Sequence, residues 1–164
     1  IEEVDNLEAA GVRVEPRVVP LETTDGEFAL SLALREAEIV RVIAWRGGRL
    51  DAELANLALL ALAPSASVEL LDASGRVRLL RAPRDPLFTH LGTRLELHGA
   101  PSRPFALLAH DGAATLSLSG FAYNADHLTL PVGSSHAASN ATMETAGEIE
   151  LHAGSLLVVE GIAA

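Results

Sequence analysis

The chain has 164 residues, of which 49% are hydrophobic and only 4% aromatic, so it can form one domain with an aliphatic core. Its 12 basic and 22 acidic residues give a net charge of −10, which argues against nucleic acid or an anionic membrane as the main partner. The absence of cysteine excludes disulfides, thiolate metal sites and a cysteine nucleophile.

Three further features describe the chain as a whole. All basic residues are arginine, glutamine is absent and Met143 is the single methionine, a composition typical either of a thermophilic source or of codon bias. No apolar run reaches 18 residues, so we expect no membrane-spanning helix. The first residue is Ile1 rather than methionine, which suggests a processed or trimmed start.

The N-terminal part begins with an acidic segment, Ile1–Gly11, which we expect to form an arm or a short helix. Valines then alternate with polar residues over 12–19, but Pro16 interrupts them. Because proline lacks an amide donor, this pattern predicts an edge strand or two short strands.

The next segments predict turns and strands. Thr24–Gly26 is typical of a turn, and the alternation over Phe28–Leu34 predicts a strand with one buried face. Ile39–Trp45 is rich in β-branched residues and predicts a second strand, which Gly47 and Gly48 would end in a turn.

The pattern changes over Asp51–Ala63, where alanine, leucine and glutamate dominate. We predict one short helix at about 51–62, with Asp51 at its N-cap and Pro64 ending it. A buried strand is the alternative, since the leucines are dense enough for either.

Short strands predominate in the rest of the chain. Ala73–Gly75 and Asp111–Gly112 are typical of hairpin turns, and Arg81–Arg94, with two prolines, predicts a long loop. The predicted strands are Val68–Leu71, Val77–Leu80, Leu95–Leu97, Phe105–Leu108, Thr115–Leu118, Phe121–Tyr123, Leu128–Leu130, Glu148–Leu151 and Leu156–Val159. About ten short strands predict an all-β fold, a jelly-roll or β-sandwich barrel, with residues 1–11 as an arm and 12–164 as a single jelly-roll domain.

The six histidines are candidate metal ligands. On a strand, Glu96 and His98 share a face, as do Glu148, Glu150 and His152. We interpret these sets as solvated strand faces, because a zinc site needs three or four converging ligands.

The segment 125–140 carries the spacing Pro-x-Gly-x-x-His-x-x-x-Asn, and it resembles the second motif of the cupin family of jelly-roll barrels. The resemblance implies that Gly133 turns a corner, that Asp126 is the loop residue and that His136 is a metal ligand. The first cupin motif, His-x-His followed by Glu, has no counterpart upstream of Phe105. The alternative is a Pro-Gly corner with an incidental histidine.

Catalytic motifs are missing from the sequence. No Gly-x-Ser-x-Gly elbow is present, and Gly47-Gly48 lacks the spacing of a phosphate-binding P-loop. We therefore assign no catalytic residue, no cofactor and no cofactor-binding residue, leave His136 as the candidate metal ligand, and expect a protein that is not an enzyme.

Size and strand pattern, with segments such as Phe28–Leu32 and Gly154–Val159, resemble the single jelly-roll capsid proteins of tailless icosahedral phages. The arginine-only composition resembles such a protein from a phage of a thermophilic host such as Thermus. The resemblance implies a capsid or capsid-decoration subunit that assembles through strand edges, its acidic arm and the terminal strand Ser155–Glu160.

On this hypothesis the partners are further copies and other virion proteins, with no nucleic acid, no membrane span and no small-molecule substrate, and the location is the virion. The alternatives are a cupin-type metal-dependent enzyme or a sugar-binding barrel with an extracellular or cytoplasmic location. Sugar binding would use exposed aromatics, and Trp45 and Tyr123 are the candidates.

Overall fold

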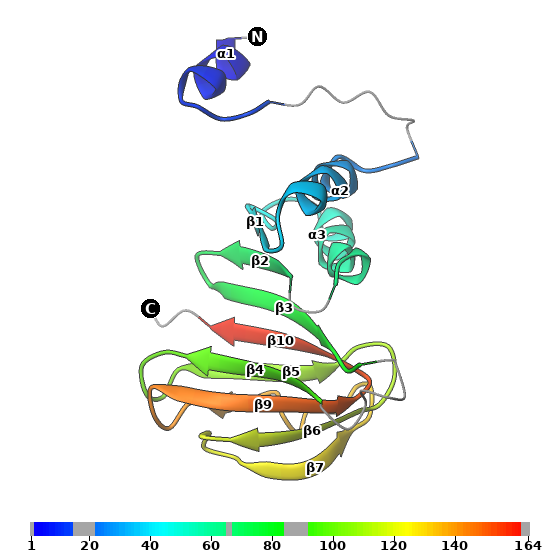
Figure 1. The fold of residues 1–164 in the computed structure, drawn as a ribbon, viewed down its shortest axis with the longest axis vertical. Coiled ribbons are helices and arrows are strands. Elements are labelled where there is room, and N and C mark those ends of the chain that lie inside the picture. Colours follow the sequence, from blue (N-terminus) through cyan, green and yellow to red (C-terminus); the bar gives the residue numbers. More distant parts are fainter. Residues whose placement is uncertain (1, 15–21, 65–66, 84–91, 162–164) are drawn as a thin grey trace.

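The computed structural model describes residues 2–14, 22–64, 67–83 and 92–161, with the side chains of Glu2 and Glu3 excepted. These residues form ten strands and a few short helices, and all ten strands belong to two facing sheets (Figure 1). The helices are α1 (Glu2–Ala9), α2 (Asp25–Glu36), α3 (Leu50–Ala58) and the short 3₁₀ helix η1 (Leu59–Leu62). None of the described helices is both long enough and apolar enough to cross a membrane.

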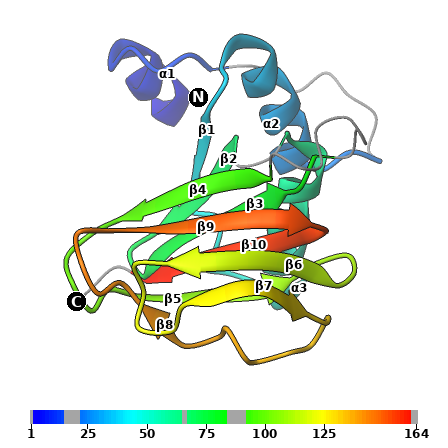
Figure 2. The same ribbon diagram turned by 60° about the horizontal axis from the view of Figure 1, so that its bottom comes forward.

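The strands divide between a six-stranded sheet A and a four-stranded sheet B, which face each other as two layers (Figure 2). Sheet A has the order β1-β2-β3-β10-β5-β8, and sheet B has the order β4-β9-β6-β7. Among the described strands, β1 and β2 pair in parallel and the other pairs are antiparallel. The bounds are β1 (Val40–Ile43), β2 (Val68–Asp72), β3 (Gly75–Arg81), β4 (Thr93–His98), β5 (Pro104–Ala109), β6 (Ala114–Ser119), β7 (Ala125–Leu130), β8 (Asn140–Ala141), β9 (Ala146–Ala153) and β10 (Ser155–Gly161).

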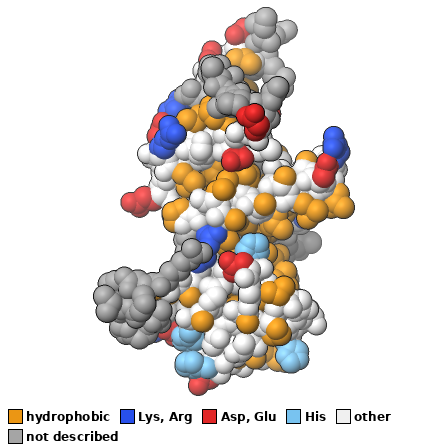
Figure 3. Space-filling view, turned by 90° about the vertical axis from the view of Figure 1, so that its right-hand side faces the viewer, with side chains coloured by type: hydrophobic (Ala, Val, Ile, Leu, Met, Phe, Trp, Pro, Cys, Tyr) orange, Lys and Arg blue, Asp and Glu red, His pale blue; other side chains and the backbone are white. Residues whose placement is uncertain are grey.

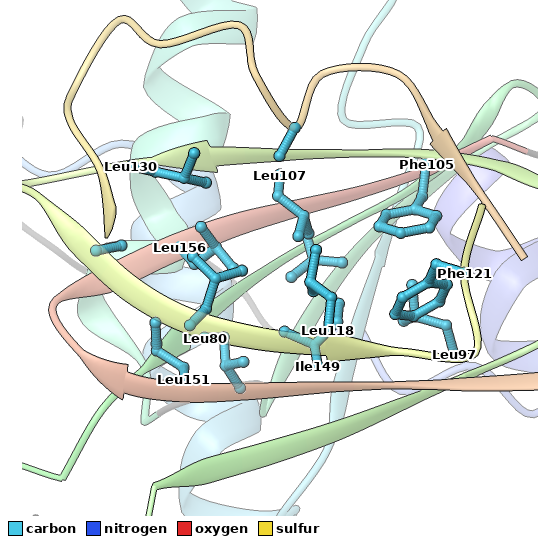
Figure 4. Close-up of a cluster of buried hydrophobic side chains, with 14 residues drawn as sticks. Leu80, Leu97, Phe105, Leu107, Leu118, Phe121, Leu130, Ile149, Leu151 and Leu156 are labelled. Carbon is cyan, nitrogen blue, oxygen red and sulfur yellow. The ribbon is translucent and has the colours of Figure 1, made fainter. Parts of the chain in front are cut away.

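A first hydrophobic core fills the space between the two sheets (Figure 4). Leu107, Leu116 and Leu156 are fully buried there, and the rings of Phe105 and Phe121 lie 4.5 Å apart. These side chains alternate along their strands with residues that point away from the core, which is the pattern that closes a β-sandwich.

A second core lies on the opposite face of sheet A, where α2, α3 and η1 cover β1, β2 and β3. Leu30 of α2 and Leu60 of η1 pack there with Leu70 and Leu79 of the sheet. In sheet A, β3 pairs with β10, and β10 pairs with β5. The strands beneath the helices and the strands of the sandwich therefore belong to one sheet.

Four charged side chains are held together on the sandwich side of β2, β3 and β10. Glu160 is 2% exposed and accepts hydrogen bonds from Arg76 at 2.8 and 2.9 Å and from Arg78 at 2.6 Å. Glu69 lies 3.2 Å from Arg76 on the other side. Each buried charge therefore has an opposite charge beside it, which buried ions require.

At the coarse level the expected β-rich sandwich is confirmed, since the described chain is mostly β-sheet with a few short helices. The helix predicted at about 51–62 is confirmed as α3 followed by η1, but its N-cap is Arg49 instead of Asp51. The division into an arm at 1–11 and one domain at 12–164 stays a prediction.

Several local predictions were wrong. Phe28–Leu34 lies in the helix α2 instead of a strand, because Thr24 caps a helix by accepting the Glu27 N–H, and alanine, leucine and glutamate then favour helix. Asp111–Gly112 does not close a hairpin, because β5 and β6 belong to different sheets. Phe121–Tyr123 contributes only an isolated bridge to Thr142.

Near the N-terminus, residues 12–14 form no strand, and the rest of the predicted edge strand, 15–19, lies outside the described residues. The terminal strand Ser155–Glu160, expected to be free for assembly, lies in the middle of sheet A as β10, where β3 and β5 pair with it on either side. It therefore offers no free edge to a partner.

Candidate functional site

The β1–α3 loop, residues Ala44–Arg49, connects the carboxyl end of β1 to the first turn of α3. β1 and β2 are parallel, and ligands of α/β sheets bind beyond the carboxyl ends of such strands. Ala44 and Gly47 have φ values of +57° and +107°, so the chain turns sharply here in a conformation that favours glycine. We take this loop as the candidate site.

Two side chains of α3 fasten the loop. Asn56 Nδ2 donates to the carbonyl oxygen of Trp45 at 2.8 Å, and Glu53 Oε1 accepts the Gly47 N–H at 2.9 Å. Since Asn56 and Glu53 lie one turn apart on a single helix, they hold both halves of the loop at fixed places.

Arginines flank the two glycines of the loop. Arg49 forms a bidentate pair with Asp51, with nitrogen–oxygen distances of 3.0 and 2.5 Å, although both side chains are largely exposed. The hydrogen bond raises the pKa of the Arg49 guanidinium and lowers the pKa of the Asp51 carboxyl. Arg46 lies over the Trp45 ring, 5.6 Å from its centroid, and contacts Asp72 at 3.2 Å.

The start of α2 lies beside this loop. A Cβ on Gly26 would lie 3.3 Å from the Asn56 side chain and 3.1 Å from that of Leu59, so the first turn of α2 packs closely on α3. Two helices thus begin near the loop, at Asp25 and at Leu50. The N-terminus of a helix favours anions, because its amides and dipole present positive charge. With the two arginines, this arrangement suits a phosphorylated ligand.

The sequence of this loop predicts only a turn. The spacing around Gly47-Gly48 differs from that of a P-loop, and Asp51 fits the N-cap of a helix. The signal that could have found the site is the order of a β-branched strand, two glycines, an arginine and a helix start.

The structure places His136 away from this loop, on the connection between β7 and β8, where its side chain is exposed. Gly133 does turn the chain with a φ of +81°, but Asp126 pairs with His127 at 2.8 Å, and among the described residues no group of three His, Asp or Glu could hold a metal. The assignment of His136 as a metal ligand stays a prediction, because its side chain is exposed, whereas the neighbouring Ala137 is buried in the core between the sheets.

The other same-face sets are solvated strand faces. Glu96 and His98 form an exposed pair at 3.1 Å, while Glu148 and Glu150 face Arg94. His152 instead contacts Ser117 at 2.8 Å and stacks on His127, with ring centroids 4.4 Å apart.

The aromatic candidates for sugar binding lie apart. Tyr123 is 70% exposed beside β8, whereas Trp45 is partly buried in the β1–α3 loop with an indole N–H that has no partner among the described residues. Figure 3 shows charged side chains scattered over one face of the molecule, with hydrophobic side chains between them. Because Tyr123 is exposed beside β8 whereas Trp45 is partly buried in the β1–α3 loop, the two rings do not form one aromatic platform.

Asn140 fixes the turn that carries Tyr123. Its Oδ1 accepts the N–H groups of Tyr123 at 3.1 Å and Ala141 at 2.9 Å, and its Nδ2 donates to the Tyr123 carbonyl at 2.9 Å. We expect Asn140→Ala to lower the free energy of unfolding by about 2 kcal/mol, because these backbone groups lose their partners. Urea unfolding measures this.

The matched control for that prediction is Asn124→Ala. Asn124 is exposed and accepts a single N–H, from Phe121 at 3.0 Å, so the loss should be smaller. Equal losses in the two variants would contradict the clamp assigned to Asn140.

No protein-family model matches the chain, and no curated protein matches it. Several solved structures match the chain. The thiamine pyrophosphokinase of Bacillus subtilis matches with a TM-score of 0.80 at 20% identity, over 99% of this chain and 73% of that one. That of Geobacillus thermodenitrificans gives 0.77 at 22% identity over the same shares, and that of Candida albicans gives 0.58 at 15% over 76% and 44%.

These matches correct the functional hypotheses. The resemblance to phage capsid jelly rolls is wrong, and with it the virion subunit, its virion partners and its virion location, because the solved proteins that match this fold are thiamine pyrophosphokinases. The expectations of a non-enzyme and of no small-molecule substrate are wrong for the same reason. At these identities the similarity concerns architecture: the chain has the fold of solved thiamine pyrophosphokinases.

Proposed function

We propose that this chain works in pyrophosphoryl transfer from a nucleoside triphosphate to the hydroxyl group of thiamine or a closely related alcohol. The observation that carries the proposal is the β1–α3 loop, with Gly47, Gly48 and Arg49 at the carboxyl end of a parallel strand. The fold match over 99% of the chain supports the same reaction class.

The residues of the loop suit the phosphates of such a donor. An added Cβ at Gly47 or Gly48 would meet nothing within 4 Å, so the backbone there is open to a ligand. The Arg49 guanidinium offers two parallel N–H donors, which match a phosphate as they match the Asp51 carboxylate in the structure.

The reaction makes a bond between the acceptor oxygen and the β-phosphorus and breaks the bond between that phosphorus and the oxygen that links it to the α-phosphate. It releases a nucleoside monophosphate and the proton of the acceptor hydroxyl. Negative charge on the phosphate oxygens must be neutralised during this step, and arginines and helix N-termini supply that stabilisation. The exposed carboxylate of Asp51 would hold a Mg²⁺ ion here, and that ion would supply further neutralisation of the phosphate charge.

Arg49→Ala tests the proposal. With Mg-ATP and thiamine, we expect the protein to form thiamine diphosphate, and the variant to lose kcat/KM on the order of 10²-fold, because a bidentate charged contact to phosphate is removed. Arg49→Lys should recover only part of the rate, since lysine keeps the charge but not the planar fork. Chromatography of the fluorescent thiochrome derivatives measures the product.

Arg35→Ala is the matched control, because it removes an exposed arginine from the far end of α2. It should leave the rate unchanged. An absence of product together with an absence of ATP binding by calorimetry would contradict the proposed function, and so would equal rates for Arg49→Ala and the unaltered protein.

We also retain two structural proposals. One is that residues 1–11 form an arm and 12–164 a single domain, which the continuity of sheet A from β1 to β8 supports. The other is a jelly-roll order of connections, which the crossings between sheets from β5 to β6 and from β9 to β10 support.

A further inference from the structure

The donors of the β1–α3 loop are already occupied by carboxylates of α3. Glu53 accepts the Gly47 N–H at 2.9 Å, and Asp51 holds the Arg49 guanidinium through two hydrogen bonds. Backbone hydrogen bonds from the Asp51 and Ala52 amides to the Asp51 carboxylate also help to lower its pKa. The groups that would bind phosphate therefore bind the protein's own anions.

The two carboxylates differ in how strictly they exclude a ligand. A guanidinium carries five N–H donors, so Arg49 can hold Asp51 and a phosphate together. A backbone amide carries one proton, so Gly47 can serve either Glu53 or a ligand oxygen. Glu53 is also partly buried, whereas Asp51 is exposed.

We propose that Glu53 is a built-in competitor for the anion site, an inference that rests on the proposed function. When no ligand is bound, the Glu53 carboxylate accepts the hydrogen bond of the Gly47 amide. A phosphate must displace this carboxylate before it can accept that hydrogen bond. Because carboxylate and phosphate carry the same sign of charge, Glu53 near the loop also repels the incoming anion. The residue thus sets the affinity of the loop and favours ligands that bring a neutralising cation.

A role in fastening alone predicts the opposite result. If Glu53 only held the loop in shape, loss of its charge would loosen the loop and weaken binding. Glu53→Gln separates the two roles, since the amide oxygen of glutamine can still accept the Gly47 N–H while the negative charge is gone.

The experiment measures the binding of inorganic pyrophosphate by calorimetry at fixed ionic strength and without divalent cation. We expect Glu53→Gln to bind three- to tenfold more tightly than the unaltered protein. Glu38→Gln is the control, because it removes an exposed carboxylate just before β1, at the opposite end of the strand from the loop, and it should leave the affinity unchanged.

A second readout follows the amide resonance of Gly47 in ¹⁵N spectra. It should move when pyrophosphate is added, because the hydrogen-bond acceptor of that amide changes. Pyrophosphate binding that leaves the Gly47 resonance in place overturns the competition, whatever the affinity.

The outcomes distinguish the phosphate site from the proposed role of Glu53. If the unaltered protein binds pyrophosphate and Arg49→Ala does not, while Glu53→Gln binds equally or more weakly than the unaltered protein, the competitor is refuted and the phosphate site stands. If neither the unaltered protein nor Glu53→Gln binds pyrophosphate, the proposed role of Glu53 is refuted, whereas the proposed function is refuted only if product formation and ATP binding are also absent. Pyrophosphate binding by Glu53→Gln but not by the unaltered protein supports the proposed role of Glu53.

Discussion

Glu160→Gln is expected to lower the free energy of unfolding by about 3–5 kcal/mol, because it removes the nearer of the two carboxylates that neutralise the buried Arg78 and the partly buried Arg76. Glu160 is 2% exposed and bonds to both Arg76 and Arg78, and the latter is itself 7% exposed. Guanidinium chloride would screen ion pairs, so urea unfolding monitored by circular dichroism is the measurement.

The same cluster predicts how stability depends on pH. Burial by itself raises the pKa of Glu160, but the hydrogen bonds and positive charges of Arg76 and Arg78 outweigh it, so the pKa is lowered overall. A carboxyl with a lowered pKa in the folded state stabilises the protein above its unfolded pKa of about 4.3 and loses this contribution as the pH falls further. Unfolding free energies measured from pH 6 down to pH 3 should therefore drop less steeply in Glu160→Gln.

Glu36→Gln is the control for both measurements. Glu36 also forms a bidentate arginine pair, with Arg13 at 2.8 and 2.9 Å, but both side chains are 59% exposed. Water screens such a pair, so this variant should unfold like the unaltered protein. Equal destabilisation by the two substitutions would refute the special role of the buried cluster.

Gly147→Ala is expected to cost about 3 kcal/mol, because the new methyl group would overlap the Phe121 ring in the sandwich core. Three ring carbons of Phe121 lie where that Cβ would be placed, and Phe121 is 2% exposed with Phe105 packed against it. The ring cannot move away without opening the core between the two sheets. Thermal and urea unfolding would both report the loss.

Gly48→Ala provides the comparison. An added Cβ at Gly48 would meet nothing within 4 Å, so the same chemical change should leave stability nearly unaltered. A Gly147→Ala variant as stable as Gly48→Ala would mean that Phe121 has room to shift, and the dense packing of this core would be disproved.

The sequence alone does not reveal the candidate site, because residues of the types that form it are common in turns and helices. Gly47, Gly48 and Arg49 fit an ordinary turn, and Glu53 fits the exposed side of a helix. Their role as a candidate site depends on the parallel pairing of β1 with β2 and on the hydrogen bond from Gly47 to Glu53. A local sequence pattern contains neither of these.

Segment 125–140 shows the converse, a motif-like spacing whose side chains do not converge. The spacing of Gly133, His136 and Asn140 resembled a metal-binding motif, yet Asn140 serves the Tyr123 turn and His136 is exposed. Spacing along the chain does not determine which side chains converge, because the direction of each depends on the strands around it.

The sequence by itself determined the β-rich character, most strand positions after residue 67 and the helix at about 51–62, because alternation and helix-forming composition are local properties. It also determined that the core is aliphatic. The tertiary structure decided that Phe28–Leu34 is helical, that β10 is a central strand and that β1 ends in a charged loop between two helix starts. Those features arise from contacts between segments far apart in the chain, and only packing selects among the local alternatives.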